Sequence, residues 1–160
     1  MASKTPLPVD LPPAQSPGFL IRDTNLHLLR VLRSFLNAHH ISTAQWFLLR
    51  VLWSEEGLSQ RQLSDRVGTT EPTTQSALRL MEERGIIRQV RSTEDRRTKE
   101  IFLTEAGRQL EAELIPFAME VNRMGTRGMS EEEIAQFIGL ITRIRDNLVG
   151  LVPQNGENEL

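Results

Sequence analysis

The chain has 160 residues and a formal net charge of −2, which fits one domain with short extensions. It contains no cysteine, so disulfides, thiolate metal sites and thiol-based redox sensing are excluded. Aromatic residues make up only 5% of it, which argues against a base-stacking platform, and no apolar run approaches the roughly 18 residues that span a bilayer.

The N-terminal segment is rich in proline and has no basic start followed by an apolar core. It is therefore not a secretory signal, and residues 1–18 are expected to form a flexible arm. Residues 153–160 are expected to form a loose tail. The sequence predicts a soluble cytoplasmic protein.

Residues 19–39 are expected to form the first helix. Leu28, Leu32 and Leu36 recur at helical spacing, while Leu29 and Val31 widen the apolar surface beyond one stripe. A helix that is apolar on more than one side needs more than one neighbour.

Capping-box patterns mark the next two helices. The pair Ser42 and Gln45 opens a helix over residues 44–53, and the pair Ser59 and Gln62 opens a short helix that ends near Val67. The side chains expected to face inward in these two helices are Phe47, Leu48, Val51, Leu52, Leu63 and Val67.

A tight turn and a further helix follow. Gly68 permits a left-handed turn, and Thr70 is the expected N-cap of a helix that Gly85 ends. Its expected buried stripe consists of Ala77, Leu78 and Met81.

Residues 86–91 and 98–103 alternate in polarity like paired strands, with a charged loop at 92–97 between them. Thr104 is expected to cap a long helix over residues 105–124. Pro116 predicts a kink or a local break in this helix.

A third capping box, Ser130 with Glu133, opens a last helix over residues 134–151. Its apolar stripe consists of Ile134, Phe137, Ile138, Ile141, Ile144 and Leu148.

Two short helices joined by a tight turn and followed by a hairpin describe a winged helix-turn-helix, a fold suited to DNA. The segment 79–99 carries seven basic and four acidic side chains, so it is a candidate for polyanion binding although the whole chain is mildly acidic. The fourth helix leaves Thr73, Gln75, Ser76 and Arg79 free to reach base edges. The alternative is an ordinary solvent-exposed helix face.

Residues 44–110 resemble the MarR family of bacterial transcription regulators. The resemblance rests on "GLSQRQLSDRVG", "LMEERGIIRQ", "EDRR" and "IFLTEAG". It implies a mainly α fold with a small β-hairpin wing, in a MarR-type domain over residues 19–152. Residues 42–104 would be the DNA-binding core, and residues 19–39 and 105–151 its flanking dimerisation helices.

The resemblance further implies a homodimer on a pseudo-palindromic DNA operator, acting as a repressor that a small ligand releases. Arg97 would enter the minor groove, Asp95 would orient it and Arg96 would contact a phosphate. The alternative for Asp95 and Arg97 is a solvated salt bridge of about 0–1 kcal/mol. The full set of candidate DNA-binding residues is Ser59, Gln60, Thr70, Thr73, Gln75, Ser76, Arg79, Arg91, Asp95, Arg96, Arg97 and Lys99.

The fourth helix departs from the family pattern. Members often carry an apolar residue and an arginine where this chain has Thr74 and Ser76. The operator sequence therefore cannot be carried over.

The family's effector pockets imply a site for an acidic aromatic ligand at Trp46 and Arg50, which lie one helical turn apart. The alternative for Trp46 is ordinary core packing. No cofactor or membrane partner is expected. A metal is not expected either, because adjacent helix residues such as His39 and His40 point about 100° apart. The sequence has no Gly-rich phosphate loop, G-x-S-x-G or H-E-x-x-H, so an enzyme is not expected. The alternative function is a winged-helix protein-interaction module that does not bind DNA.

Overall fold

The computed structural model describes residues 12–93, 95–149 and 151. They form two compact units, one ending at Asn122 and the other beginning at Arg123. Residues 1–11 of the expected arm and the whole of the expected tail at 153–160 lie outside the described residues.

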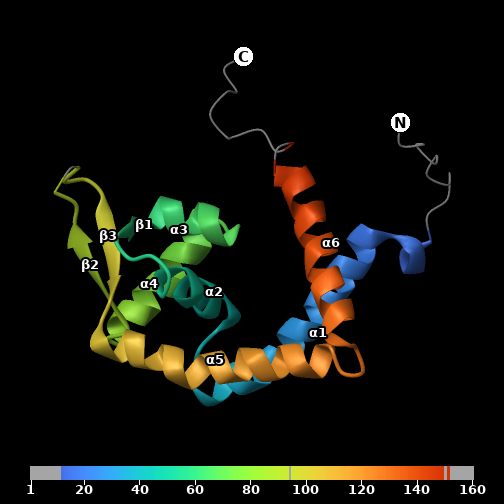
Figure 1. Ribbon diagram of the computed structural model, residues 1–160. Helices are drawn as coiled ribbons and strands as arrows, with labels where there is room; N and C mark the ends of the chain where they lie inside the picture. Colours follow the sequence, from blue (N-terminus) through green and yellow to red (C-terminus); the bar gives the residue numbers. More distant parts are fainter. Residues whose placement is uncertain (1–11, 94, 150, 152–160) are drawn as a thin grey trace. The chain divides into compact units, whose positions relative to one another are not determined.

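The predicted fold class, mainly helical with a small hairpin, is confirmed (Figure 1). The elements are a short 3-10 turn at Pro13–Gln15, α1 (Pro17–Ala38), α2 (Thr43–Leu52), β1 (Leu58–Ser59), α3 (Gln60–Val67), α4 (Glu71–Glu83), β2 (Ile87–Arg91), β3 (Lys99–Leu103), α5 (Glu105–Gly125) and α6 (Glu131–Val149). Strand β1 was not predicted, because two residues are too few to show an alternating pattern.

The predicted helix starts are confirmed by their hydrogen bonds. Ser42 Oγ accepts from the Gln45 amide at 3.2 Å, and Gln45 Oε1 accepts from the Ser42 amide at 2.9 Å. Ser59 and Gln62 form the same reciprocal pair at the start of α3. Each box satisfies two amides that a helix start would otherwise leave unpaired.

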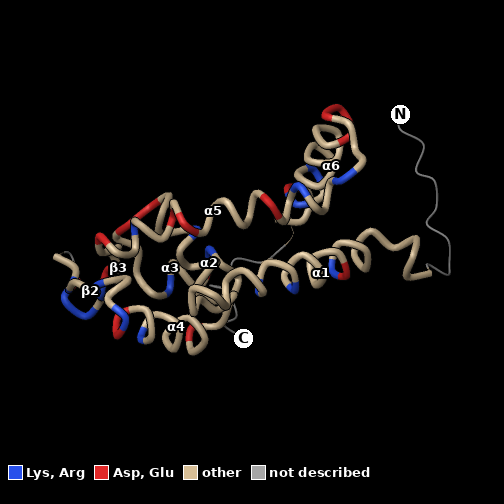
Figure 2. The backbone as a smooth tube through the Cα atoms, turned by 90° about the horizontal axis from the view of Figure 1, so that it is seen from below, with Lys and Arg blue, Asp and Glu red and all other residues tan. Residues whose placement is uncertain are grey.

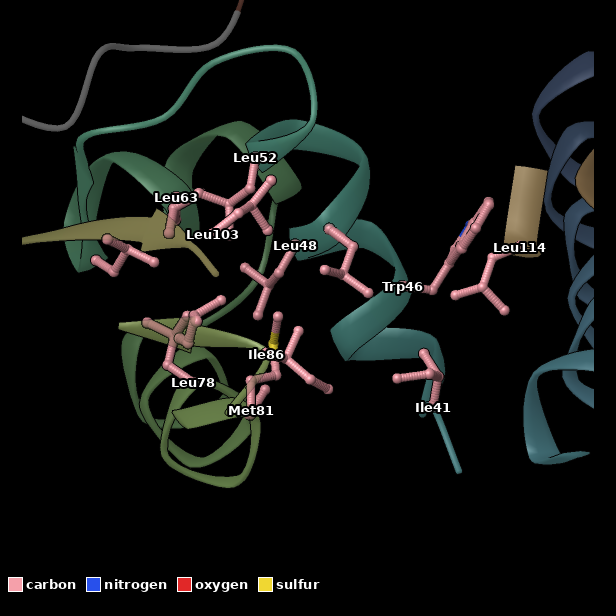
Figure 3. Close-up of a cluster of buried hydrophobic side chains, with 14 of the residues drawn as sticks. Ile41, Trp46, Leu48, Leu52, Leu63, Leu78, Met81, Ile86, Leu103 and Leu114 are labelled. Carbon is pink, nitrogen blue, oxygen red and sulfur yellow. The ribbon is translucent and has the colours of Figure 1, made fainter. Parts of the chain in front are cut away.

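The core of the first unit lies between α1, α2, the helix-turn-helix, the sheet and α5. Figure 3 shows Leu48 and Leu52 of α2 directed toward this cluster, and Trp46 directed toward Leu114. The prediction that Phe47 faces inward is wrong: its side chain is 38% exposed. Leu49, on the opposite side of α2, is buried instead.

The three strands form one antiparallel sheet in the order β1-β3-β2. In the hairpin, Ile87 pairs with Leu103 and Arg91 with Lys99. The Cα atoms of Leu58 and Ile101 are partners on the other edge of β3. The β2–β3 hairpin, hereafter the wing, lies at the outer edge of the helix-turn-helix (Figure 1).

Helix α5 begins where Thr104 Oγ1 accepts a hydrogen bond from the Gly107 amide at 3.2 Å, as an N-cap does. The helix is continuous through Pro116, so the expected local break does not occur. Neighbouring side chains hold this stretch, since Leu114 is buried and the Phe117 ring stacks on Phe35 at 5.2 Å.

In the second unit, α6 begins with the predicted capping box of Ser130 and Glu133. None of the described residues of α6 is buried. Phe137, Ile138 and Leu148 are 49–56% exposed. Within the described residues, none of the helices combines the length and apolar character needed to cross a membrane.

Candidate nucleic-acid interface

A groove of about 690 Å³ lies between α3, α4 and the wing. Half of the candidate DNA-binding residues line it: Ser59, Gln60, Gln75, Arg79, Arg97 and Lys99. They come from three segments that are separate in the sequence. The fold therefore brings the two helices and the wing around one concave, polar surface.

The remaining candidates on α4 lie elsewhere on that helix. Thr73 and Ser76 line a shallower depression of about 450 Å³ beside the start of α2. Thr70 is the N-cap of α4, and its hydroxyl accepts from the Thr73 amide at 3.4 Å. The candidate DNA-binding residues of α4 therefore lie on two neighbouring surfaces. Gln75 and Arg79 line the groove, and Thr73 and Ser76 line the depression.

At the tip of the wing, Asp95 holds Arg97 in place. Asp95 Oδ1 accepts from the Arg97 backbone amide at 2.9 Å and lies 3.5 Å from Arg97 Nε. The hydroxyl of Thr98 donates to Asp95 Oδ2 at 3.1 Å. The Arg97 amide, then the Thr98 hydroxyl, lower the pKa of the Asp95 carboxyl below its ordinary value because they stabilise the ionised form.

The guanidinium that Asp95 orients points into solvent, since the Arg97 side chain is 94% exposed. Arg96 is exposed and makes no ion pair within the described part of the chain. Arg91, also exposed, ends β2 opposite Lys99. Figure 2 shows basic positions gathered along the wing.

Several groove residues were missed by the sequence analysis. Arg61, Glu71 and Glu82 also line the groove. The Glu82 carboxylate accepts from the backbone amide and the side-chain amide of Gln89, at 3.1 and 2.8 Å, which links α4 to the wing. No short motif connects residues seven apart across a helix end and a strand, so this pair could not be predicted.

The family model of the MarR family matches residues 41–99, which hold the helix-turn-helix and most of the wing. The solved structure of transcriptional regulator PA3341 has a TM-score of 0.74 and 30% sequence identity, covering 83% of this chain and 98% of that one. The chain belongs to the MarR family.

The chain is also similar to two other transcriptional regulators. The HTH-type transcriptional regulator TtmR of Methylorubrum extorquens strain PA1 is 33% identical over 119 residues, which cover 74% of this chain. The chain spans about 60% of the length of that curated relative. A MarR transcriptional regulator from Methanosarcina mazei Go1 has the same fold, with a TM-score of 0.80 at 22% identity over 84% of this chain and 97% of that one. These relatives are described as transcriptional regulators rather than enzymes.

A cavity of about 230 Å³ lies between α1, α2 and α5 of this MarR-family chain, within the first unit. Trp46 and Arg50 both line it. The Arg50 guanidinium carbon lies 5.6 Å from the centre of the Trp46 ring, which itself packs edge-on against Trp53. Among the described residues, no carboxylate forms an ion pair with Arg50.

Proposed function

We propose that the protein is a homodimeric, sequence-specific DNA-binding transcription regulator that acts in the bacterial cytoplasm. The observation that carries this proposal is the groove bounded by α3, α4 and a wing whose Arg97 is exposed and held by Asp95. Family membership supports the same conclusion. Helix α4, which lines this groove, is the second helix of the helix-turn-helix, the element that enters the major groove in such proteins.

Helix α4 would read base edges. Gln75 and Arg79 lie one turn apart and line the groove, and amide and guanidinium groups pair with adenine and guanine respectively. Thr73 and Ser76 would contact the same duplex from the neighbouring surface. Ser59, at the start of α3, would lie near the phosphate backbone.

The wing would contact the adjacent minor groove. A narrow minor groove concentrates negative potential and attracts a guanidinium. Arg97 meets that requirement because its side chain extends into solvent while Asp95 limits the conformations it can adopt. Arg96, which has no partner of its own among the described residues, would contact a phosphate.

Two copies of the chain would bind together. In the first unit, Phe19, Leu20 and Leu26 of α1 are 40–46% exposed, and α6 of the second unit exposes its own apolar stripe. Apolar faces of this extent are typical of association surfaces. A homodimer would place two α4 helices about 34 Å apart, on one side of a pseudo-palindromic operator.

The regulator would be a repressor that a small acidic aromatic ligand releases from DNA. The cavity beside Trp46 offers an aromatic wall, and Arg50, which forms no ion pair among the described residues, adds a positive charge to its lining. The aromatic ring of such a ligand would stack on Trp46, and its carboxylate would pair with Arg50. Benzoate and naphthoate are suitable probes, read by Trp fluorescence and by loss of DNA binding.

The DNA-binding proposal is tested by fluorescence anisotropy with a duplex that the protein selects from a randomised pool. Arg97→Ala should weaken binding by about 1–3 kcal/mol while the dimer stays intact in sedimentation. Arg96→Ala is the comparison, since loss of one phosphate contact should lower the slope of log K against log salt by about 0.9. Unchanged affinity for Arg97→Ala would show that the wing is assigned wrongly.

The alternative is a winged-helix module that binds another protein. It predicts that no duplex binds at any salt concentration and that a protein partner is captured instead. Binding that weakens steeply between low and moderate salt contradicts this alternative.

A further inference from the structure

A single guanidinium ties the end of α4 to the end of α1. Arg84 is the C-cap residue of α4. Its Nη1 donates to the His40 carbonyl at 2.5 Å, and its Nη2 donates to the His39 carbonyl at 3.1 Å. These contacts join segments 44 and 45 residues apart.

The accepting carbonyls belong to a well-defined helix end. The Ile41 amide donates to the Leu36 carbonyl and the His40 amide to the Asn37 carbonyl, which is the Schellman arrangement. His40 takes the left-handed position with φ 56°, where glycine is usual. Carbonyls at a helix end carry partial negative charge, so a forked cation is a suitable partner for two of them.

The same helix end is also held by α5. His39 Nδ1 lies 3.4 Å from Glu113 Oε2. The His39 ring lies 5.3 Å from the Phe117 ring, which in turn stacks on Phe35 of α1 at 5.2 Å. His39 therefore contacts α5 through its side chain and Arg84 through its carbonyl.

These contacts continue to the cavity beside Trp46. Leu32, one turn before Phe35 on α1, lines the cavity, and so does Ala118, which directly follows Phe117 on α5. Every residue in this series lies in the first unit. A shift of α1 against α5 at the cavity would therefore also change the contact between Phe35 and Phe117 and the position of His39.

We infer that Arg84 is a positioning residue for DNA recognition: it fixes the C-terminal end of α4 to the α1–α2 turn and couples α4 to the cavity-lining helices. This inference rests on the proposed DNA-binding function. It assigns Arg84 no contact with DNA. The fork matters because a single ammonium group cannot hold both carbonyls in the same planar geometry.

Arg84→Lys and Arg84→Met separate positioning from a direct charge contact. Loss of hydrogen bonds to a charged group corresponds to about tenfold weaker binding, and we expect both variants to lose this much affinity for the selected duplex. The slope of log K against log salt should not change in either. A phosphate contact would instead be retained by lysine, and its loss in Arg84→Met would lower the slope by about 0.9.

A readout in the free protein accompanies the binding experiment. Hydrogen exchange in Arg84→Lys should be faster at the end of α4 and in the α1–α2 turn, and unchanged in the β2–β3 hairpin. Arg145→Lys is the matched control, because Arg145 also makes two side-chain contacts, to Asp146, but lies in the second unit. It should leave duplex affinity and exchange at α4 unchanged.

Coupling to α5 is measured with a double-mutant cycle. Phe117→Leu should weaken duplex binding severalfold in the wild-type background and have little further effect beside Arg84→Lys. Additive effects would overturn the coupling, and full affinity in Arg84→Lys would overturn the positioning role. If the wild-type protein binds no duplex at all, the proposed function fails instead, which is a distinct result.

Discussion

One carboxylate organises the tip of the wing. Asp95 accepts hydrogen bonds from the Arg97 amide and the Thr98 hydroxyl, so the loop is ordered through its ionised form. The pKa of Asp95 is lowered by these donors. A lowered pKa means that the associated stabilisation is present above the unfolded-state value and is lost as the pH falls through the folded-state pKa.

The NMR chemical shift of the Arg97 amide, measured against pH, tests whether the ionised Asp95 carboxylate accepts its hydrogen bond. We expect this shift to follow the titration of Asp95, with a midpoint below 3.8, the ordinary pKa of an aspartate. In Asp95→Asn the transition should be absent, and duplex affinity should fall in the same direction as in Arg97→Ala. A midpoint at or above the ordinary value would contradict the assigned hydrogen bonds.

At the residue scale, contacts between near neighbours in the sequence could be predicted, and contacts between distant segments could not. The resemblance implied the contact between Asp95 and Arg97, and two residues on a loop tip can meet without help from the fold. Thr74 shows the opposite case. It is only 1% exposed, and its hydroxyl lies 2.9 Å from that of Ser64. The departure from the family pattern at Thr74 therefore lies at the packed α3–α4 contact, which no local pattern reveals.

At the scale of elements, the start of α5 is packed too closely for any side chain at Gly107. A Cβ atom there would lie 2.2 Å from the Ile86 carbonyl oxygen. The Gly107 carbonyl also accepts a hydrogen bond from Trp53 Nε1 at 3.0 Å. This position joins α5 to the end of α2 and to Ile86, the residue that precedes β2.

Gly107→Ala should therefore lower the free energy of unfolding by about 1–3 kcal/mol, because backbone rather than a flexible side chain must move. Urea unfolding measures the change. Gly139→Ala is the matched control, since among the described residues nothing beyond its own stretch of helix backbone lies within 4 Å of the added Cβ. It should stabilise α6 by about 0.5–1 kcal/mol. Equal effects of the two substitutions would contradict the close contact.

Helix starts were predictable because a capping box is a local hydrogen-bond pattern, and all three formed. Strand β1 and the orientation of Phe47 were not, because both depend on tertiary neighbours. The continuity of α5 through Pro116 also depends on tertiary neighbours. Proline removes one helix hydrogen bond, but the burial of Leu114 and the stacking of Phe117 keep the surrounding turns helical.

At the scale of the whole molecule, periodicity predicted the apolar stripe of α6 but not what covers it. The stripe remains exposed in the single chain. An amphipathic helix in water gains most of its stability by packing its apolar face. A second copy of the chain is the cover that we propose, and it would also provide the second α4 helix for a two-part operator.

Placing charges on the α6 stripe tests this assembly. The double variant Ile138→Glu and Ile144→Glu should sediment with the mass of one chain, because a dimer would have to bury two carboxylates per copy. Gln136→Glu is the control. It adds the same side chain at an exposed position of the same helix, away from the stripe, and it should sediment as two chains. The double variant should also lose most of its affinity for the selected duplex, since one α4 helix would reach only one half-site. A stable dimer of the double variant would show that the dimer interface does not include the α6 stripe.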